Sequence, residues 1–284
     1  MNNKFKKLLS VILCAAMLLT TASVAFAAEE YEHFTEGLFT YRTKAGEAII
    51  VKCDTSAVGD VVIPNLTQSG YPVCGIIENA FENCTGITCL AIGENISFLN
   101  NAFPGCSSLE KFIADENNKK FFTDEYGVLY GRFEISDSIY LAAYPTANKS
   151  EHYTVLDEVW LIKADFENCA NLKTLTVPES VREVKDCSFN NCPKLTDIYY
   201  GGTQRKWASN DGVWTLPEGV TLHCREESLF EKIEAEIDIA IGKSNIPWGF
   251  IIYCISYAFL LLFGTVISPV TLPISLILQL FNII

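Results

Sequence analysis

A pattern of apolar and polar positions recurs four times along the chain. Each copy begins at a phenylalanine, and residues typical of a protein core follow it at offsets 3, 6, 9 and 11. The opening phrases read AFENC, AFPGC, DFENC and SFNNC. The last three offsets spell L-x-x-L-x-L, the strand-bearing half of a leucine-rich repeat. Because strand side chains alternate with period two, offsets 9 and 11 share one face, which we expect to point inward.

The repeated positions are expected to form columns inside the protein. Successive phenylalanines are 22, 63 and 23 residues apart, and the two short spacings lie in the range of leucine-rich repeats. A single unit has no second layer on which to bury its apolar side, so neighbouring units must stack. We therefore predict a mainly β leucine-rich-repeat solenoid over residues 71–200. Its structural ladder consists of Phe81, Phe103, Phe166, Phe189, Cys84, Cys106, Cys169 and Cys192.

The segments beside and between the repeats predict two caps and an insert. Residues 28–70 contain short apolar runs bounded by Gly, Asp or Pro, which predicts an N-terminal β cap. Residues 201–224 predict a C-terminal cap, because an uncapped solenoid exposes its core. Residues 115–150 break the period and predict a β-hairpin insert, which in solenoids is commonly found on a binding face. Its candidate binding residues, which packing on the coils explains equally well, are Tyr126, Tyr130 and Tyr140.

The C-terminal part has a different character. Residues 225–243 place Phe230, Ile233 and further apolar residues at helical spacing among acidic ones, which predicts an acidic amphipathic linker helix. Residues 244–284 contain no charge, and 247–267 is long enough to cross a lipid bilayer as a transmembrane helix. The remaining residues are interrupted by two prolines and are too few for a comfortable second crossing, so an interfacial segment, a re-entrant segment and packing against the first helix all remain open.

The N-terminus and the charge indicate export. Residues 1–27 have a basic start, an apolar run and the small-residue pattern Ala25-Phe26-Ala27, which predicts a signal peptide cleaved before Ala28. Lipid attachment at Cys14 is the alternative, but Leu13 before it is not a small residue. Removing the three signal lysines changes the formal charge from −13 to −16. An exported chain this acidic is a poor ligand for nucleic acid or anionic headgroups.

The cysteines and histidines indicate packing rather than chemistry. Eleven cysteines in an exported protein would suggest disulfides, but the ladder cysteines occupy one repeat position, where a thiol acts as a small buried hydrophobe. A disulfide between Cys84 and Cys106 remains conceivable. His33, His152 and His223 are scattered, and no phosphate loop or nucleophile elbow is present. We expect no enzyme activity, no cofactor and no metal site.

The chain resembles the BspA-like leucine-rich repeat family of bacterial surface proteins. The matching segments are GDVVIP, YPVCGIIENAF, the AFENC-type phrases with their leucines, VPESVREVKDCSF, EYGVLYGRF, YLAAYP and IYYGGTQRKW, between about Phe39 and Cys224. The resemblance implies a β-rich solenoid exposed at the cell surface, with some members binding matrix proteins or other bacteria. No binding residue is transferred with it, and an LPxTG-type sorting motif is absent from this sequence.

These features favour a membrane-tethered surface protein that recognises or adheres to an extracellular protein or glycan. Export, the uncharged tail, the repeat array and the missing catalytic cluster all agree with this function. The alternative is a structural or assembly scaffold on the cell envelope, whose tail binds a membrane partner.

Overall fold

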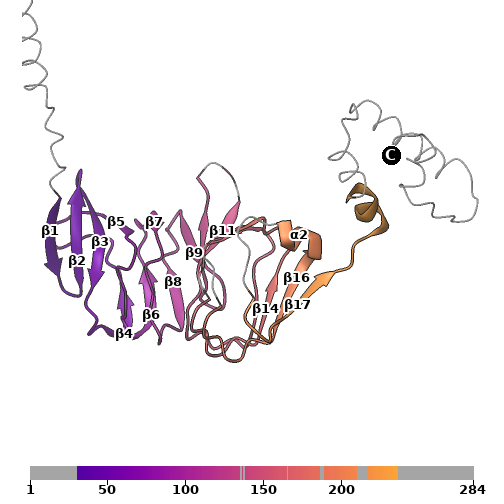
Figure 1. Cartoon of the computed structure of the whole chain (residues 1–284). Helices are drawn as coiled ribbons and strands as arrows, with labels where there is room; N and C mark the ends of the chain where they lie inside the picture. Colours follow the sequence, from indigo (N-terminus) through magenta and orange to yellow (C-terminus); the bar gives the residue numbers. More distant parts are fainter. Residues whose placement is uncertain are drawn as a thin grey trace, which may run out of the picture. The chain divides into compact units, whose positions relative to one another are not determined.

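The structure, a computed structural model, describes residues 31–134, 136, 138–164, 166–185, 189–209 and 216–235. Of the described residues, those up to 201 and those within 207–223 belong to one compact unit, and those within 202–206 and 224–235 belong to a second. Figure 1 shows the first unit as a succession of short strands. This unit confirms the mainly β solenoid with stacked repeats.

The first sheet begins with the three N-terminal strands and continues into the repeats. The first three strands pair antiparallel, and parallel pairing begins where β3 meets β5. The sheet has the order β1-β2-β3-β5-β7. Its members are β1 (Glu32–Glu36), β2 (Phe39–Lys44), β3 (Glu47–Cys53), β5 (Val73–Ile76) and β7 (Phe98–Leu99).

A second sheet with the same role begins with the three strands of the insert. It has the order β15-β13-β11-β10-β9. Its members are β9 (Phe121–Thr123), β10 (Leu129–Arg132), β11 (Ile139–Ala143), β13 (Val159–Ile162) and β15 (Glu183–Val184).

The L-x-x-L-x-L strands form two further sheets, β4-β6-β8 and β12-β14-β16-β17. Successive strands from β4 to β8 and from β12 to β16 pair parallel. Leu90 lies opposite Phe112, and Leu175 lies opposite Ile198, so offset 9 of one coil meets offset 9 of the next. The members are β4 (Val58–Val62), β6 (Gly86–Ile92), β8 (Lys111–Ala114), β12 (His152–Thr154), β14 (Thr174–Val177), β16 (Asp197–Thr203) and β17 (Thr221–Arg225). A short helix, α2 (Gln204–Ser209), follows β16.

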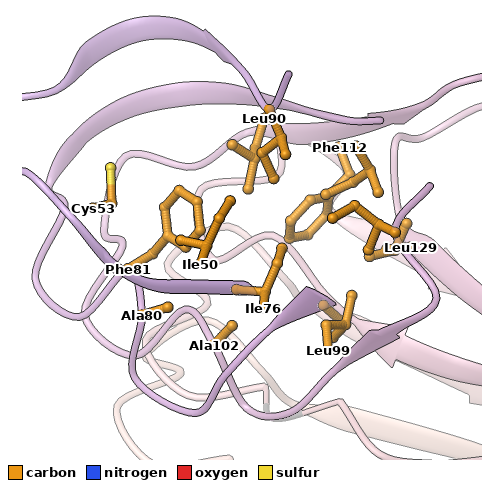
Figure 2. Close-up of a cluster of buried hydrophobic side chains, with 14 of the residues drawn as sticks. Ile50, Cys53, Ile76, Ala80, Phe81, Leu90, Leu99, Ala102, Phe112 and Leu129 are labelled. Atoms are coloured by element: carbon orange, nitrogen blue, oxygen red, sulfur yellow. The ribbon is translucent and has the colours of Figure 1, made fainter. Parts of the chain in front are cut away.

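The core lies between the two sets of sheets. Figure 2 shows side chains from both sets meeting there, with Ile50 and Ile76 facing Phe81, Leu90 and Phe112. Each of these five side chains is at most 1% exposed. Burial of one such side chain contributes roughly 1.5–3 kcal/mol, and this contribution requires the neighbouring coil to be present.

The hairpin predicted within residues 115–150 is present, but it belongs to a larger sheet. Its two apolar runs form β10 and β11, which pair antiparallel, while β9 pairs antiparallel with β10 and β11 runs parallel to β13. The prediction did not include these outer pairings, which make Ile139–Ala143 an almost fully buried strand with neighbours on both sides. Buried strands of this kind are continuous apolar runs without alternation.

The turn between β9 and β10 is tied to the preceding coil. Asp124 Oδ1 accepts hydrogen bonds from the backbone N–H groups of Tyr126, at 3.0 Å, and Val128, at 2.9 Å. Gly127 has a φ of 75°, and a Cβ atom there would lie 2.4 Å from Cβ of Lys111. Only glycine therefore allows this turn to approach β8 so closely.

The second unit contains the start of the predicted linker helix. Residues 229–235 are helical, residues 225–228 precede this helix, and residues 236–243 lie outside the described residues. Ser228 and Glu231 form a capping box: Ser228 N–H donates to Glu231 Oε2 at 2.9 Å, and Glu231 N–H donates to Ser228 Oγ at 3.3 Å. In the part of the chain that is described, no helix has the length and apolarity needed to span a membrane. The segments 1–27 and 247–267 lie outside that part.

Candidate functional site

The ladder phenylalanines pack in ring-to-ring contact inside the first unit. The Phe81 and Phe103 ring centroids are 5.4 Å apart, and those of Phe166 and Phe189 are 5.3 Å apart. Tyr144 packs on Phe166 at 4.9 Å, in the coil that the sequence pattern leaves without a phenylalanine. The rings are buried or partly buried and stabilise the stack, so they are not available to a ligand.

The ladder cysteines bond to the backbone of neighbouring coils. Cys106 Sγ donates to the Phe81 carbonyl at 3.1 Å, and Cys192 Sγ donates to the Phe166 carbonyl at 2.9 Å. Cys84 and Cys106 are free thiols, and burial raises the pKa of Cys106 to about 12. Cys169 is buried beside Glu167, whose carbonyl accepts from its Sγ. Thiols of this kind stay protonated and unreactive at neutral pH.

The three candidate tyrosines of the insert lie in different environments. Tyr130 is fully buried, and its hydroxyl hydrogen-bonds that of Tyr153, which donates to Asp124 Oδ2 at 2.7 Å. Tyr140 is 9% exposed, and its ring packs against Phe133. Burial and hydrogen bonding thus exclude Tyr130 and Tyr140 as ligand contacts, while Tyr126 remains 46% exposed.

A set of polar side chains that the sequence left scattered lies on one face of the sheet β12-β14-β16-β17. We call it the polar face. Strand alternation directs its side chains outward while Tyr153, Leu175 and Ile198 point into the core. Its members are His152, Thr154, Thr174, Thr176, Asp197, Tyr199 and His223.

Two hydrogen bonds join members of the polar face that lie on neighbouring strands. His152 Nδ1 and Thr174 Oγ1 are 2.9 Å apart, and His223 Nε2 and Asp197 Oδ1 are 2.7 Å apart. Thr196 Oγ1 donates to Asp197 Oδ2 at 2.7 Å. The His223 contact, and then the Thr196 contact, lower the pKa of Asp197. Asp197 is therefore a carboxylate at neutral pH.

Tyr199 gives the polar face an aromatic contact surface. Its ring stacks on that of His223 with a centroid distance of 4.5 Å and an interplanar angle of 12°, and it is 44% exposed. Side chains fixed on strands keep their positions better than side chains on loops. The polar face therefore presents hydrogen-bond donors, hydrogen-bond acceptors and one large ring at fixed positions. Among the described residues, no group of three or more His, Cys, Asp or Glu side chains is placed to hold a metal ion.

The repeat period was the sequence signal for this face. His152, Thr174 and Asp197 are 22 and 23 residues apart, which are the spacings of the ladder phenylalanines. Thr154, Thr176 and Tyr199 follow with the same spacings. Stepping along the chain by one period would have brought these polar residues together in the same way as the apolar ones.

Comparison with known proteins identifies the repeats. The model of the BspA type leucine rich repeat region matches six copies, over residues 63–126 and 148–210. A search of the curated proteins finds no match.

Several solved structures are similar to the chain. A leucine-rich repeat protein from T. pallidum is 18% identical, with a TM-score of 0.36, and the match covers 72% of this chain and 95% of that one. A leucine-rich repeat protein from Bacteroides capillosus is 22% identical, with a TM-score of 0.32 and coverages of 60% and 99%. A leucine rich cell surface protein from Faecalibacterium prausnitzii is 12% identical, with a TM-score of 0.30 and coverages of 72% and 98%. The chain therefore contains BspA-type leucine-rich repeats over residues 63–126 and 148–210, as the resemblance predicted.

Proposed function

We propose that this chain is an exported, membrane-tethered recognition protein that binds an extracellular protein through the polar face. The observation that carries the proposal is the pair of inter-strand hydrogen bonds on the polar face, His152 to Thr174 and His223 to Asp197, with Tyr199 stacked on His223. Small molecules are usually held in concave pockets, whereas this face is a sheet surface, so a protein is the fitting partner. With export directed by residues 1–27 and tethering by 247–267, the face lies outside the cell.

The alternative is a scaffold whose tail binds a membrane partner, with the repeat array acting as a spacer. Under this alternative, deleting residues 226–284 abolishes complex formation, and the repeat array retains no ligand. Under the recognition proposal, the same deletion releases the protein from the membrane, but ligand binding persists.

The proposal is tested with the full chain in detergent, immobilised and exposed to extracellular-matrix proteins and to cell envelopes. Tyr199→Ala should weaken binding of the retained partner about tenfold or more, because exposed tyrosines are frequent binding hot spots. Tyr126→Ala is the matched control, an exposed tyrosine on the insert. If Tyr126→Ala alone weakens binding, the insert is the recognition site. If neither source yields a partner, the recognition proposal fails.

A further inference from the structure

A basic groove, separate from the polar face, is lined mainly by residues of the insert. It has a volume of about 730 Å³, and none of its lining residues belongs to β12, β14, β16 or β17. Three of those residues are cations, Lys119, Lys120 and Arg132, and one, Glu134, is a carboxylate. The chain as a whole has 34 acidic and 21 basic residues. The groove is therefore a local cluster of positive charge on a protein whose net charge is negative.

The two lysines stand on a backbone that a buried side chain holds in place. Asn118 is 5% exposed and directs its side chain into the fold. Its Nδ2 donates to the carbonyls of Gly93, at 2.7 Å, and Ile96, at 3.0 Å. Its Oδ1 accepts from the N–H groups of Lys120, at 2.8 Å, and Phe121, at 2.7 Å. Four hydrogen bonds of one buried amide thus fix the position from which both lysines extend.

Arg132 is fixed next to them. Its N–H donates to the Lys120 carbonyl at 2.8 Å, and its Nη1 donates to the Lys119 carbonyl at 3.5 Å. Its guanidinium carbon lies 4.3 Å from the ring centroid of Phe122, which stacks on the buried Tyr130 at 5.5 Å. The guanidinium is held against a ring that is itself packed, so little freedom is lost when it binds an anion.

The acidic residue of the groove neutralises it only partly. Lys120 Nζ lies 3.9 Å from Glu134 Oε1, a long contact, and the Glu134 side chain is 82% exposed. Exposed ion pairs of this kind are weak, so an incoming anion can displace Glu134. The Lys120 side chain is only 20% exposed, and partial desolvation strengthens its attraction for an anion.

The groove also offers an apolar surface and a hydroxyl. Phe133 lines it and packs edge-on against Trp160, which is 41% exposed. Ser97 lines it as well. A sugar ring carries an apolar face and many hydroxyl groups, and 730 Å³ lies in the range of small-ligand sites. We infer that the groove binds an anionic sugar unit, with its carboxylate or sulfate on Lys119, Lys120 and Arg132 and its ring against Phe133.

The inference is tested with the full chain in a nonionic detergent by isothermal titration calorimetry. The probes are a heparin tetrasaccharide, which carries sulfates, trigalacturonate, which carries only carboxylates, and neutral chitotriose. We expect at least one anionic probe to bind, chitotriose to bind at least tenfold more weakly, and affinity to fall as salt rises. Comparing the two anionic probes shows whether the groove binds sulfate groups or carboxylate groups.

The variants assign the binding to the groove. The double variant Lys119→Gln/Arg132→Gln should weaken binding of the anionic probe about tenfold or more, because hydrogen bonds to charged groups are being removed. Lys52→Gln, an exposed lysine on β3, is the matched control and should leave binding unchanged. Unchanged melting temperatures show that both variants are folded. Equal losses in the two variants, or no binding of either anionic probe, would overturn the inference.

Two more measurements distinguish a sugar ligand from an acidic peptide, and the groove from the polar face. An acidic decapeptide of glutamate is titrated in parallel, and if it alone binds in a Lys119-dependent way, the ligand is a peptide and the sugar assignment is wrong. Tyr199→Ala, which tests the polar face, should not change binding of the anionic sugar. The groove and the proposed function can therefore succeed or fail independently.

Discussion

At the scale of single residues, the second position after each ladder phenylalanine sets the shape of the coil. Asn83, Gly105, Asn168 and Asn191 occupy it, with φ values of 58°, 74°, 59° and 56°. Asparagine and glycine are the residues that adopt this left-handed conformation most easily. These asparagines and the glycine recur in the repeated phrases of the sequence. A pattern of apolar positions does not report backbone conformation, so it did not predict that they are left-handed.

Asn191 provides a test of this requirement. Its Nδ2 also donates to Asn168 Oδ1 at 2.7 Å, one coil away. Asn191→Ala should lower the free energy of unfolding by about 1–2 kcal/mol, mainly through the left-handed backbone. Asn191→Gly loses the same hydrogen bond but keeps the conformation, so it should cost less. Urea unfolding of both variants compares them, and a larger loss for the glycine variant would contradict the argument.

The ladder thiols should resist modification in the folded protein. Burial raises the pKa of Cys106 to about 12, so at pH 8 only about one molecule in 10⁴ has the reactive thiolate there. We expect N-ethylmaleimide to modify the half-buried Cys74 of the native protein while Cys84 and Cys106 remain unmodified. Peptide mass mapping measures this, with the urea-unfolded chain as the fully labelled control. Similar labelling of all three in the native protein would show that the ladder is open.

At the scale of elements, the strands that repeat with the period could be predicted from the sequence, whereas the pairing of the strands in the insert could be predicted only in part. Offsets 9 and 11 predicted the inward face correctly, because the buried Leu90, Leu175 and Ile198 repeat with the period of the coil. The insert has no second copy in the chain with which to compare its pattern. The apolar run Ile139–Ala143 predicted one half of a hairpin, which β10 and β11 form, but the pattern did not indicate that this strand also pairs with β13.

The insert is attached to the next coil through a buried tyrosine pair, and two single-atom changes test this attachment. Tyr153→Phe removes the hydroxyl that bonds Tyr130 and Asp124, so it should lower the free energy of unfolding by about 1–3 kcal/mol. Tyr144→Phe is the matched control, because the buried Tyr144 hydroxyl has no hydrogen-bond partner among the described residues. Its removal should be neutral or stabilising. Equal losses for both variants in urea unfolding would show that the hydrogen bonds do not carry the attachment.

At the scale of the whole molecule, the repeat joins distant residues into one surface. His152 and His223 are far apart in sequence, yet both lie on the sheet that runs through β14 and β16. The period predicts which coil positions meet, since His152, Thr174 and Asp197 keep its spacing. It does not predict His223, which lies in the C-terminal cap, 26 residues after Asp197. The basic groove could not be predicted either, because it depends on the path of the insert and on the Asn118 hydrogen bonds.

Buried thiol and phenol groups in the core also make the stability of the whole molecule depend on pH. Burial raises the pKa of Cys53 and Cys106 from 9.0 to about 12, and that of Tyr41 from 10.0 to about 12. Between pH 9 and 12 the folded chain therefore keeps protons that the unfolded chain releases. Since the native state binds more protons, the free energy of unfolding must fall as pH rises through this window. The slope is about 1.4 kcal/mol per pH unit for each retained proton.

Urea unfolding at pH 7, 9 and 10.5 measures this dependence. At pH 7 these groups are protonated in both states, and at pH 9 the thiols of the unfolded chain are only about half ionised, so most of the loss should occur above pH 9. Cys106→Ser is the control variant, because it removes one ionisable group while keeping a small side chain. It lowers stability at every pH, but its slope above pH 9 should be shallower by about one proton. A stability that is constant or rises up to pH 10.5 would mean that these thiols are not enclosed by neighbouring coils, and stacking would no longer explain why the repeats keep them.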